Sequence, residues 1–358
     1  MRTGVAGLGG EMADRFWRVL REVRPASISR DAERSFCVLI CGQAGVGKAT
    51  LRGALNGGEW PTDLTLPYLR IVEGLPGESY GASLCLYVLD ASRGLLRGHW
   101  QDAAVLADRG LPVVYVFNKM DLAPDAGAFR EAARQMFDFA DPALAFVSAS
   151  DAEDVRRRLV PAALEMVPDL RLALGRRLPA FRDEAARQVV VETARVNAEF
   201  AILSSLPASL PLVSLGAAGA DIVVLTKNQA MMLFKLAAIY GRPLRSRFQV
   251  VAELAPVVAS AFLWRMIARA AVSLLPGFVA VAPRAAVAFV GTYVVGSVAQ
   301  HYYRLGRRPS KEAIDSFTRE ALVAARRSLP RLHLPGRLGG RALLPPGRME
   351  QPDGQRAE

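Results

Sequence analysis

The chain has 358 residues, more than one typical domain needs, with a formal net charge of +11 and a pI near 10.0. Its arginines are scattered rather than gathered in a patch with interleaved aromatic residues, which argues against a nucleic-acid-binding protein. A basic chain also suits an anionic membrane surface. Cys37, Cys41 and Cys85 are predicted to lie reduced on buried strands, and the three histidines show no metal-ligand spacing.

Residues 11–24 have the periodicity of an amphipathic helix. Its apolar face carries Met12, Phe16, Val19, Leu20 and Val23. Two interpretations stay open: a helix packed on the next domain, or a helix lying on a membrane surface.

Residues 35–165 alternate strand and helix signals. Apolar runs predict strands at 35–41, 68–73, 83–89, 112–117 and 143–148. The segments between and after them predict helices at 47–56, 96–109, 126–139 and 151–167. This alternation is typical of a parallel sheet with helices on both faces, in which ligands bind at the carboxyl ends of the strands.

The sequence GQAGVGKA at 42–49 joins the first of these strands to a helix, as a phosphate-binding loop does. Its three glycines let the backbone approach phosphate, and the helix N-terminus favours negative charge. Lys48 would reach the β- and γ-phosphates of a nucleotide. The next position, normally Ser or Thr for its Mg²⁺-binding hydroxyl, is Ala49, with Thr50 one place later. The alternative is a glycine turn with a chance lysine.

Two further motifs follow later strands: NKMD at 118–121 and SAS at 148–150. A carboxylate at Asp121 can accept hydrogen bonds from N1–H and the 2-amino group of guanine, and adenine offers neither donor. In this order of motifs, residues 34–168 resemble an Era-like GTPase of the TRAFAC class. The alternative for NKMD is a surface turn with a capping aspartate.

The resemblance implies a role for each of these positions. It implies that Asn118 ties the base loop to the phosphate loop and that the aliphatic stem of Lys119 covers one face of the base. It also implies that Ser148 and Ala149 present a backbone N–H to guanine O6. The residues expected at a GTP or GDP site are Gly42, Gln43, Ala44, Gly45, Val46, Gly47, Lys48, Ala49, Thr50, Gly77, Asn118, Lys119, Asp121, Ser148 and Ala149.

The metal side of the family's pattern is altered. The family has D-x-x-G after its third strand, whereas this chain has GLPG at 74–77, so a glycine replaces the Mg²⁺ carboxylate. Gly77 can still donate its backbone N–H to a γ-phosphate. Glu73, one residue earlier, is expected to point to the opposite side of the strand unless a bulge re-aims it. Glu78 would repel a γ-phosphate. Mg²⁺ is therefore expected to be weakly held, and Thr50 can contribute only if the helix start shifts.

Two other positions complete the comparison with the family. Its first switch needs a threonine, and both Thr62 and Thr65 are available here. Asp90 ends the strand at 83–89, where Era-like chains often carry an aspartate, and we expect it to be structural.

The composition changes after residue 168. Residues 168–200 are predicted to form a charged connecting helix, and the charge-free run 201–220 is long enough to cross a bilayer core of about 30 Å. Further apolar segments lie at 225–240, 254–264, 270–283 and 285–300. A last polar helix is predicted over 306–328 with Ser310 as its N-cap, followed by a basic, disordered tail.

Residues 185–305 resemble the membrane domain of unknown function in the YcjF-like proteins of bacteria, which is also fused behind several bacterial G domains. The matching features are Pro211, the sequence GAD at 219–221, the helix ending at Tyr240, LPG at 275–277 and residues 292–296. The alternative is a soluble bundle with a very apolar core. Arg265, Arg269 and Arg284 favour that alternative, because arginine in hydrocarbon costs about 2.5 kcal/mol or more.

We therefore expect an α/β P-loop G domain, with a mostly parallel sheet and helices on both faces, followed by an all-α, apolar, membrane-associated domain. The expected units are an N-terminal amphipathic helix at 1–33, the G domain at 34–168, the helical domain at 169–328 and the tail at 329–358.

The expected function is that of a guanine-nucleotide-dependent switch with slow GTP hydrolysis at the cytoplasmic face of the inner membrane. Membrane lipid and a second copy of the chain are the expected partners beside GTP and GDP. Two alternatives stay open. One is a catalytically inactive pseudo-GTPase scaffold, and the other is a membrane-structural protein that binds no nucleotide.

Overall fold

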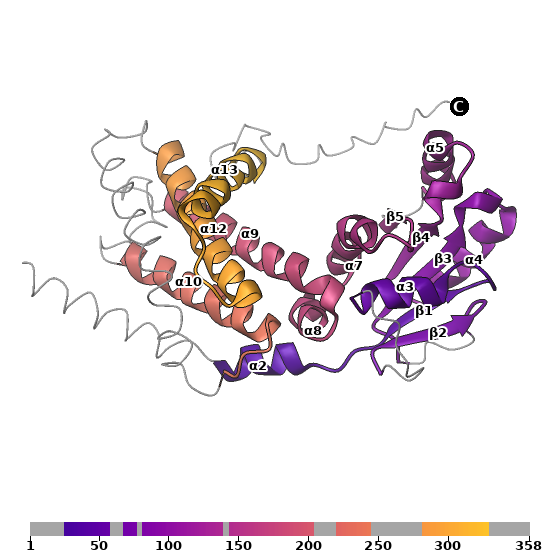
Figure 1. Cartoon of the computed structure of the whole chain (residues 1–358), viewed down its shortest axis with the longest axis horizontal. Coiled ribbons are helices and arrows are strands. Elements are labelled where there is room, and N and C mark those ends of the chain that lie inside the picture. Colours follow the sequence, from indigo (N-terminus) through magenta and orange to yellow (C-terminus); the bar gives the residue numbers. More distant parts are fainter. Residues whose placement is uncertain are drawn as a thin grey trace, which may run out of the picture.

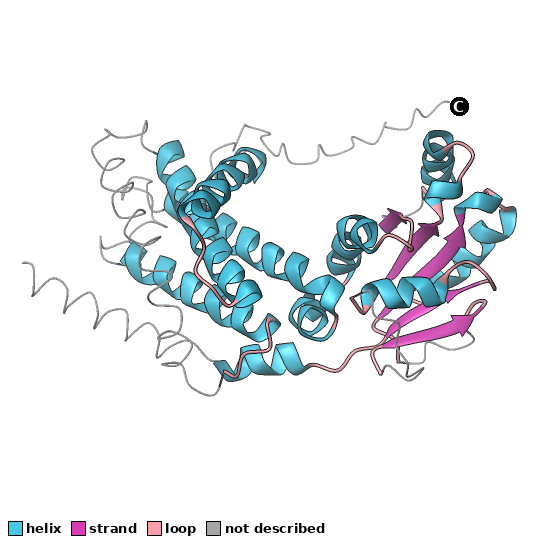
Figure 2. Ribbon diagram, in the orientation of Figure 1, coloured by secondary structure: helices cyan, strands magenta, loops and turns pink. Residues whose placement is uncertain are grey.

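The computed structural model of the chain describes residues 25–57, 67–76, 81–138, 143–203, 220–244 and 281–328. A sheet with its flanking helices forms one part of the molecule, and a group of long helices forms the other (Figure 1). The strands of the described residues, magenta in Figure 2, lie in the first part. Several predictions fall wholly or mostly outside the described residues: the helix at 11–24, Thr62, Thr65, Gly77, Glu78, the run 201–220, the segments 254–264 and 270–283 with Arg265 and Arg269, and the tail at 329–358.

Within the described residues the sheet has five strands, all parallel, which confirms the predicted parallel sheet. They are β1 (Val38–Gly42), β2 (Leu69–Glu73), β3 (Leu84–Asp90), β4 (Val113–Asn118) and β5 (Ala143–Phe146). All neighbours pair in parallel in the order β2-β1-β3-β4-β5. The chain passes from β1 to β2 on one side and then to β3 on the other, so the strand order reverses beside β1. Ligands of open α/β sheets bind at such a reversal.

Helices cover both faces of the sheet because its strands are apolar on both sides. Alternate residues of β1, such as Val38 and Ile40, pack with α3 (Lys48–Leu55) and α7 (Val160–Met166). The residues between them, such as Leu39, pack with α4 (Arg97–Ala107) and α5 (Ala126–Met136). The segment that leads from β5 into α7 contains the short α6 (Ala152–Asp154) and a π-helical turn, Val155–Leu159.

The second part consists of helices packed around α9. Its elements are α8 (Arg171–Arg177), α9 (Pro179–Leu203), α10 (Ala220–Ile239), α12 (Val281–Leu305) and α13 (Lys311–Ser328). α9 contacts α8, α10 and α12, while α13 packs on α12. α2 (Pro25–Glu33) belongs to the expected N-terminal unit at 1–33 but follows the predicted helix at 11–24, and it lies against α8 and α10 (Figure 1).

The prediction of one connecting helix over 168–200 is wrong. A short 3-10 turn, Pro168–Leu170, leads into α8, and the chain is extended at Leu178 before α9 begins at Pro179. Proline has no backbone N–H, and it disfavours helical geometry in the residue before it, so α8 cannot run on into α9. α9 is moreover a central packing element rather than a connector.

One hydrophobic cluster continues from the sheet into the long helices. It includes Leu51 of α3, Leu164 of α7, Phe181 of α9, Phe234 of α10 and Phe289 of α12. α9 itself packs on both α3 and α7. The orientation of the helices relative to the sheet is therefore fixed by a shared apolar core.

A small polar network is buried within the long helices. Asn197 Nδ2 donates to Thr292 Oγ1 at 2.9 Å, and Gln229 Nε2 donates to the same oxygen at 3.2 Å. The three residues come from α9, α12 and α10, so these hydrogen bonds set the register of the three helices. Within the described ranges, no helix combines the length and the apolar character that crossing a membrane requires.

Candidate nucleotide-binding site

The loop between β1 and α3 depends on glycine at two positions. Gly42 has φ +138° and Gly47 has φ +95°, both in the region that side chains rarely adopt. A Cβ atom on Gly42 would lie 2.3 Å from the Val88 carbonyl oxygen, and one on Gly47 would lie 2.3 Å from Asn118 Nδ2. The loop can therefore pack this closely on its neighbours only with glycine at both places.

Lys48 opens α3 and is only 5% exposed. Its ammonium donates to the Gly42 carbonyl at 2.8 Å, to the Gln43 carbonyl at 2.6 Å and to Glu73 Oε2 at 3.0 Å. The lysine thus lies inside the loop where its sequence position predicts, and it already forms an ion pair with a carboxylate.

The expectation that Glu73 points away from the loop is wrong. Glu73 is the last residue of β2 and the register partner of Gly42, which has no side chain. The chain then turns at Gly74, whose φ is +67° and whose N–H and carbonyl pair with Gly42 in an antiparallel bridge. Strict alternation of side chains ends where the strand ends, so the Glu73 carboxylate reaches Lys48.

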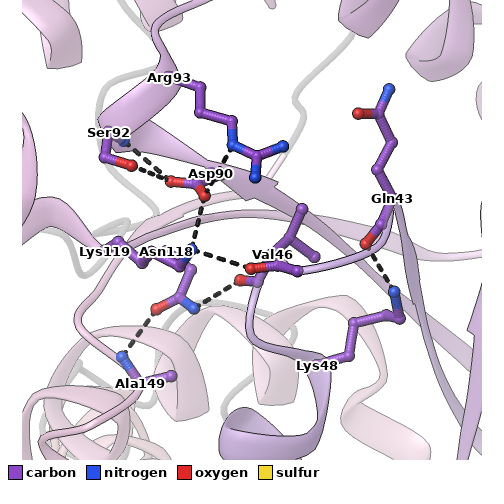
Figure 3. Close-up of polar contacts among 10 residues, drawn as sticks. Gln43, Val46, Lys48, Asp90, Ser92, Arg93, Asn118, Lys119 and Ala149 are labelled. Carbon is purple, nitrogen blue, oxygen red and sulfur yellow. Dashed lines mark hydrogen bonds and ion pairs between the residues drawn. The ribbon is translucent and has the colours of Figure 1, made fainter.

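Asn118, at the end of β4, joins three loops. Its Nδ2 donates to the Val46 carbonyl at 2.8 Å, and its Oδ1 accepts from the Ala149 N–H at 2.8 Å (Figure 3). The side chain is 2% exposed, so both hydrogen bonds are shielded from water. The tie between the phosphate loop and the base loop, expected from the resemblance, is present.

Lys119 is held across the phosphate loop. Its Nζ donates to the Gly45 carbonyl at 2.9 Å and to Asp90 Oδ2 at 2.6 Å. Burial raises the pKa of Asp90, but the hydrogen bonds from Lys119 and Ser92 together outweigh it, so the pKa lies below its ordinary value. Asp90 therefore stays ionised and positions Lys119, in keeping with its expected structural role.

Asp121 and Ser148 meet at the open side of the base loops. The Ser148 hydroxyl donates to Asp121 Oδ1, and the Ser148 N–H donates to Asp154 Oδ2 at 2.9 Å. The Ala149 N–H is engaged with Asn118 Oδ1, so both backbone donors expected for guanine O6 have acceptors within the protein. A guanine base would have to replace one of these acceptors, while the exposed Asp121 is accessible to it directly.

The two side chains that normally bind Mg²⁺ beside a phosphate loop, a hydroxyl and a carboxylate, are absent from their expected positions. Ala49 lies exposed in the first turn of α3 and has no hydroxyl, and Gly74 has no carboxylate. Thr50 follows on the same turn and is half-buried. Across the described part of the chain, no three His, Cys, Asp or Glu side chains gather into a set that could hold a metal ion. The usual metal-binding set of a GTPase is therefore incomplete.

Two contributors to this site escape the sequence motifs. One is Glu73, which contacts Lys48. The other is Arg93, whose Nε lies 3.5 Å from Asp90 Oδ2 (Figure 3). Arg93 also lies close to the loop, because a Cβ on Gly45 would meet its guanidinium nitrogen at 3.7 Å. A signal did exist for Arg93, since it follows the end of β3 and the carboxyl ends of parallel strands meet at one edge.

Gly47→Ala is expected to disrupt both the loop and nucleotide binding. The new methyl group would displace Asn118 in a backbone conformation that costs about 1–3 kcal/mol for a residue with a side chain. We expect a lower melting temperature and at least about tenfold weaker GDP binding. Gly98→Ala in α4 is the control, because a Cβ there meets nothing within 4 Å. Equal effects of the two variants would contradict the predicted role of Gly47.

No protein-family model and no curated protein sequence matches the chain. Among solved structures, it is similar to a probable GTP-binding protein EngB at 15% identity, over 37% of this chain and 99% of that chain, with a TM-score of 0.29. It is also similar to Era of Aquifex aeolicus, solved as a variant bound to GDP and AlF4⁻, at 15% identity over 57% of this chain and 89% of that chain, with a TM-score of 0.27. Because both TM-scores lie below 0.5, we base the function on the geometry of the loops.

Proposed function

We propose that the chain binds guanine nucleotides between the phosphate loop and the base loops. The observation that carries this proposal is the pair of contacts from the base motif to the phosphate loop, Asn118 to the Val46 carbonyl and Lys119 to the Gly45 carbonyl. They hold a base-reading segment and a phosphate-binding segment at a fixed separation. A surface turn with a chance lysine would not need either contact.

The two halves of the site supply complementary chemistry. The amides of the phosphate loop, the N-terminus of α3 and Lys48 offer positive charge for phosphate. The carboxylate of Asp121 offers acceptors that match the N1–H and 2-amino groups of guanine. Binding of GTP or GDP is therefore the activity that this arrangement supports best.

The test is a titration of the purified full chain with fluorescent GDP, GTP and ATP, with and without Mg²⁺. We expect saturable binding of both guanine nucleotides and a rise in melting temperature, because a ligand at a hundred times its Kd stabilises a folded protein by about 2.7 kcal/mol. Lys48→Ala should weaken nucleotide binding and reduce the rise in melting temperature. Failure of GDP and GTP to bind or to stabilise the chain would exclude the proposal.

We further propose that the chain acts at the cytoplasmic face of a membrane as a nucleotide-dependent switch, with lipid and a second copy of itself as partners. The supporting feature is the apolar character of the sequence after residue 200, together with its resemblance to a bacterial membrane domain. In switches of this kind, the γ-phosphate changes the order of loops and thereby the affinity for partners.

Membrane association predicts a specific behaviour of the full chain in a cell lysate. It should sediment with membranes at moderate salt and resist a high-salt wash, because apolar contact with lipid is not screened by ions. Sedimentation and immunoblotting before and after the wash measure this. Release by salt alone would indicate surface attachment through charge, and recovery in the first supernatant would contradict the proposal.

The second candidate is a pseudo-GTPase scaffold that is stabilised by nucleotide but does not hydrolyse it. Ala49 and Gly74 favour this function, because they remove the two donors that normally hold Mg²⁺. The two candidates share the base site and differ in turnover alone. Single-turnover hydrolysis therefore distinguishes them.

A further inference from the structure

The ammonium of Lys48 is fully engaged within the protein. A protonated lysine has three N–H donors, and here the acceptors are the carbonyls of Gly42 and Gln43 and the carboxylate of Glu73. The donor distances are 2.8, 2.6 and 3.0 Å, so each contact is a normal hydrogen bond. A phosphate oxygen can bind this lysine only if one of the three acceptors leaves.

The three acceptors differ in how easily they can leave. The carbonyls of Gly42 and Gln43 belong to the loop backbone, and Gly42 is further fixed by its bridge to Gly74. Glu73 is a long side chain at a strand end and is 69% exposed, while the lysine it contacts is 5% exposed. A change of rotamer is enough to release Glu73, so it is the acceptor that phosphate would displace.

We propose that Glu73 is an internal anion that competes with nucleotide phosphate for Lys48 and sets a preference for the diphosphate over the triphosphate. This inference rests on the proposed binding of guanine nucleotide. Glu73 and a phosphate oxygen compete for the same N–H of Lys48, so phosphate binding must break the ion pair. The displaced carboxylate stays within the Debye length of about 8 Å at physiological salt, so it also repels the bound phosphate. A γ-phosphoryl group adds negative charge beside this lysine, and GTP is therefore disfavoured more than GDP.

The opposite role for Glu73 would be that of a metal ligand, replacing the carboxylate missing at Gly74. The neighbouring groups argue against it. Ala49 and Gly74 have no oxygen in their side chains that could bind a metal ion, so Glu73 would be the single side-chain ligand among Ala49, Glu73 and Gly74. In the structure the Glu73 carboxylate instead pairs with the ammonium of Lys48. If Glu73 competes with phosphate, removing its charge should strengthen GTP binding. If Glu73 is a metal ligand, removing its charge should weaken GTP binding in the presence of Mg²⁺.

The test compares the full chain with Glu73→Gln, which keeps the shape of the side chain and removes its charge. Glu131→Gln on the exposed face of α5 is the matched control. Equilibrium titrations with GDP and GTP are run in EDTA and again with Mg²⁺, and the melting temperature of each free protein checks the fold. We expect Glu73→Gln to bind GTP about tenfold more tightly than the unmodified chain, with a smaller gain for GDP and no change for the control.

The outcomes separate the two proposals. If the unmodified chain binds both nucleotides and Glu73→Gln leaves the ratio of GTP to GDP affinity unchanged, the role of Glu73 is wrong while nucleotide binding stands. If Glu73→Gln weakens GTP binding only when Mg²⁺ is present, Glu73 is a metal ligand and the proposal is overturned. If neither protein binds GDP or GTP, the proposed function itself fails, and the inference about Glu73 fails with it.

Discussion

Asp121→Asn should transfer the preference of this protein from guanine to xanthine nucleotides. In the proposed site the carboxylate would accept two hydrogen bonds from guanine, whereas an asparagine amide can donate to the carbonyl that xanthine carries in place of the 2-amino group. Loss of these charge-assisted bonds, with polar groups left unpaired, costs about 3 kcal/mol or more. The unmodified chain should therefore prefer GTP to ATP by at least about a hundredfold.

The geometry of the base loops makes this substitution a clean test. Asp121 is exposed, and its carboxylate accepts a hydrogen bond from the Ser148 hydroxyl. The side-chain oxygen of an asparagine can accept the same hydrogen bond, so the loop should keep its shape. Competition titrations with GTP, ATP and xanthosine triphosphate measure the change. Asp138→Asn, at an exposed aspartate after α5, is the control. Equal affinity of the unmodified chain for ATP and GTP would exclude base recognition by Asp121.

The sheet and the base motif are the parts that the sequence predicts well. Strands buried on both faces form unbroken apolar runs, so all five were located within a few residues, and their parallel order follows from the alternation with helices. The tie from Asn118 to the phosphate loop is expected from the resemblance, and the parallel order permits it because the carboxyl ends of β1 and β4 lie at the same edge.

The interactions that the sequence does not predict depend on strand ends and on tertiary packing. The alternation of side chains along β2 predicts that Glu73 points away from the loop. The strand ends at Glu73 and the chain turns at Gly74, so the Glu73 carboxylate contacts Lys48 instead. The break before Pro179 has a local signal, whereas the packing of α9 on α3 and α7 has none. Buried polar contacts such as Asn197 with Thr292 join residues far apart in the chain, which no local pattern reveals.

The base side and the metal side of this site therefore differ in how complete they are. Asn118, Lys119 and Asp121 each form side-chain hydrogen bonds within the protein, and Asp90 keeps Lys119 in place. Among the described residues beside the phosphate loop, the usual metal ligands are missing, and Lys48 forms an ion pair with the Glu73 carboxylate. Nucleotide binding and phosphoryl transfer are thus expected to be separable in this chain.

The unmodified chain is expected to bind nucleotide with little dependence on Mg²⁺, to bind GDP at least as well as GTP, and to hydrolyse GTP very slowly. Phosphoryl transfer relies on a metal ion that bridges the β- and γ-oxygens and neutralises developing charge. Ala49 and Gly74 remove its usual protein ligands without touching the base site. Single-turnover hydrolysis with and without EDTA measures the rate. Robust, EDTA-sensitive turnover would contradict this assignment of the metal-side positions.

Restoring both donors, in the double variant Ala49→Ser with Gly74→Asp, should make binding and hydrolysis depend on Mg²⁺. Gly74 has φ +67°, a conformation that aspartate tolerates better than most residues, and a Cβ there meets nothing within 4 Å. Gly81→Asp is a matched control, because Gly81 has φ +64° and equally open surroundings. We expect EDTA to weaken GTP binding by the double variant at least about tenfold and to leave the control unchanged. A double variant that folds, binds GTP and remains insensitive to EDTA would show that these two positions do not form the metal side of the site.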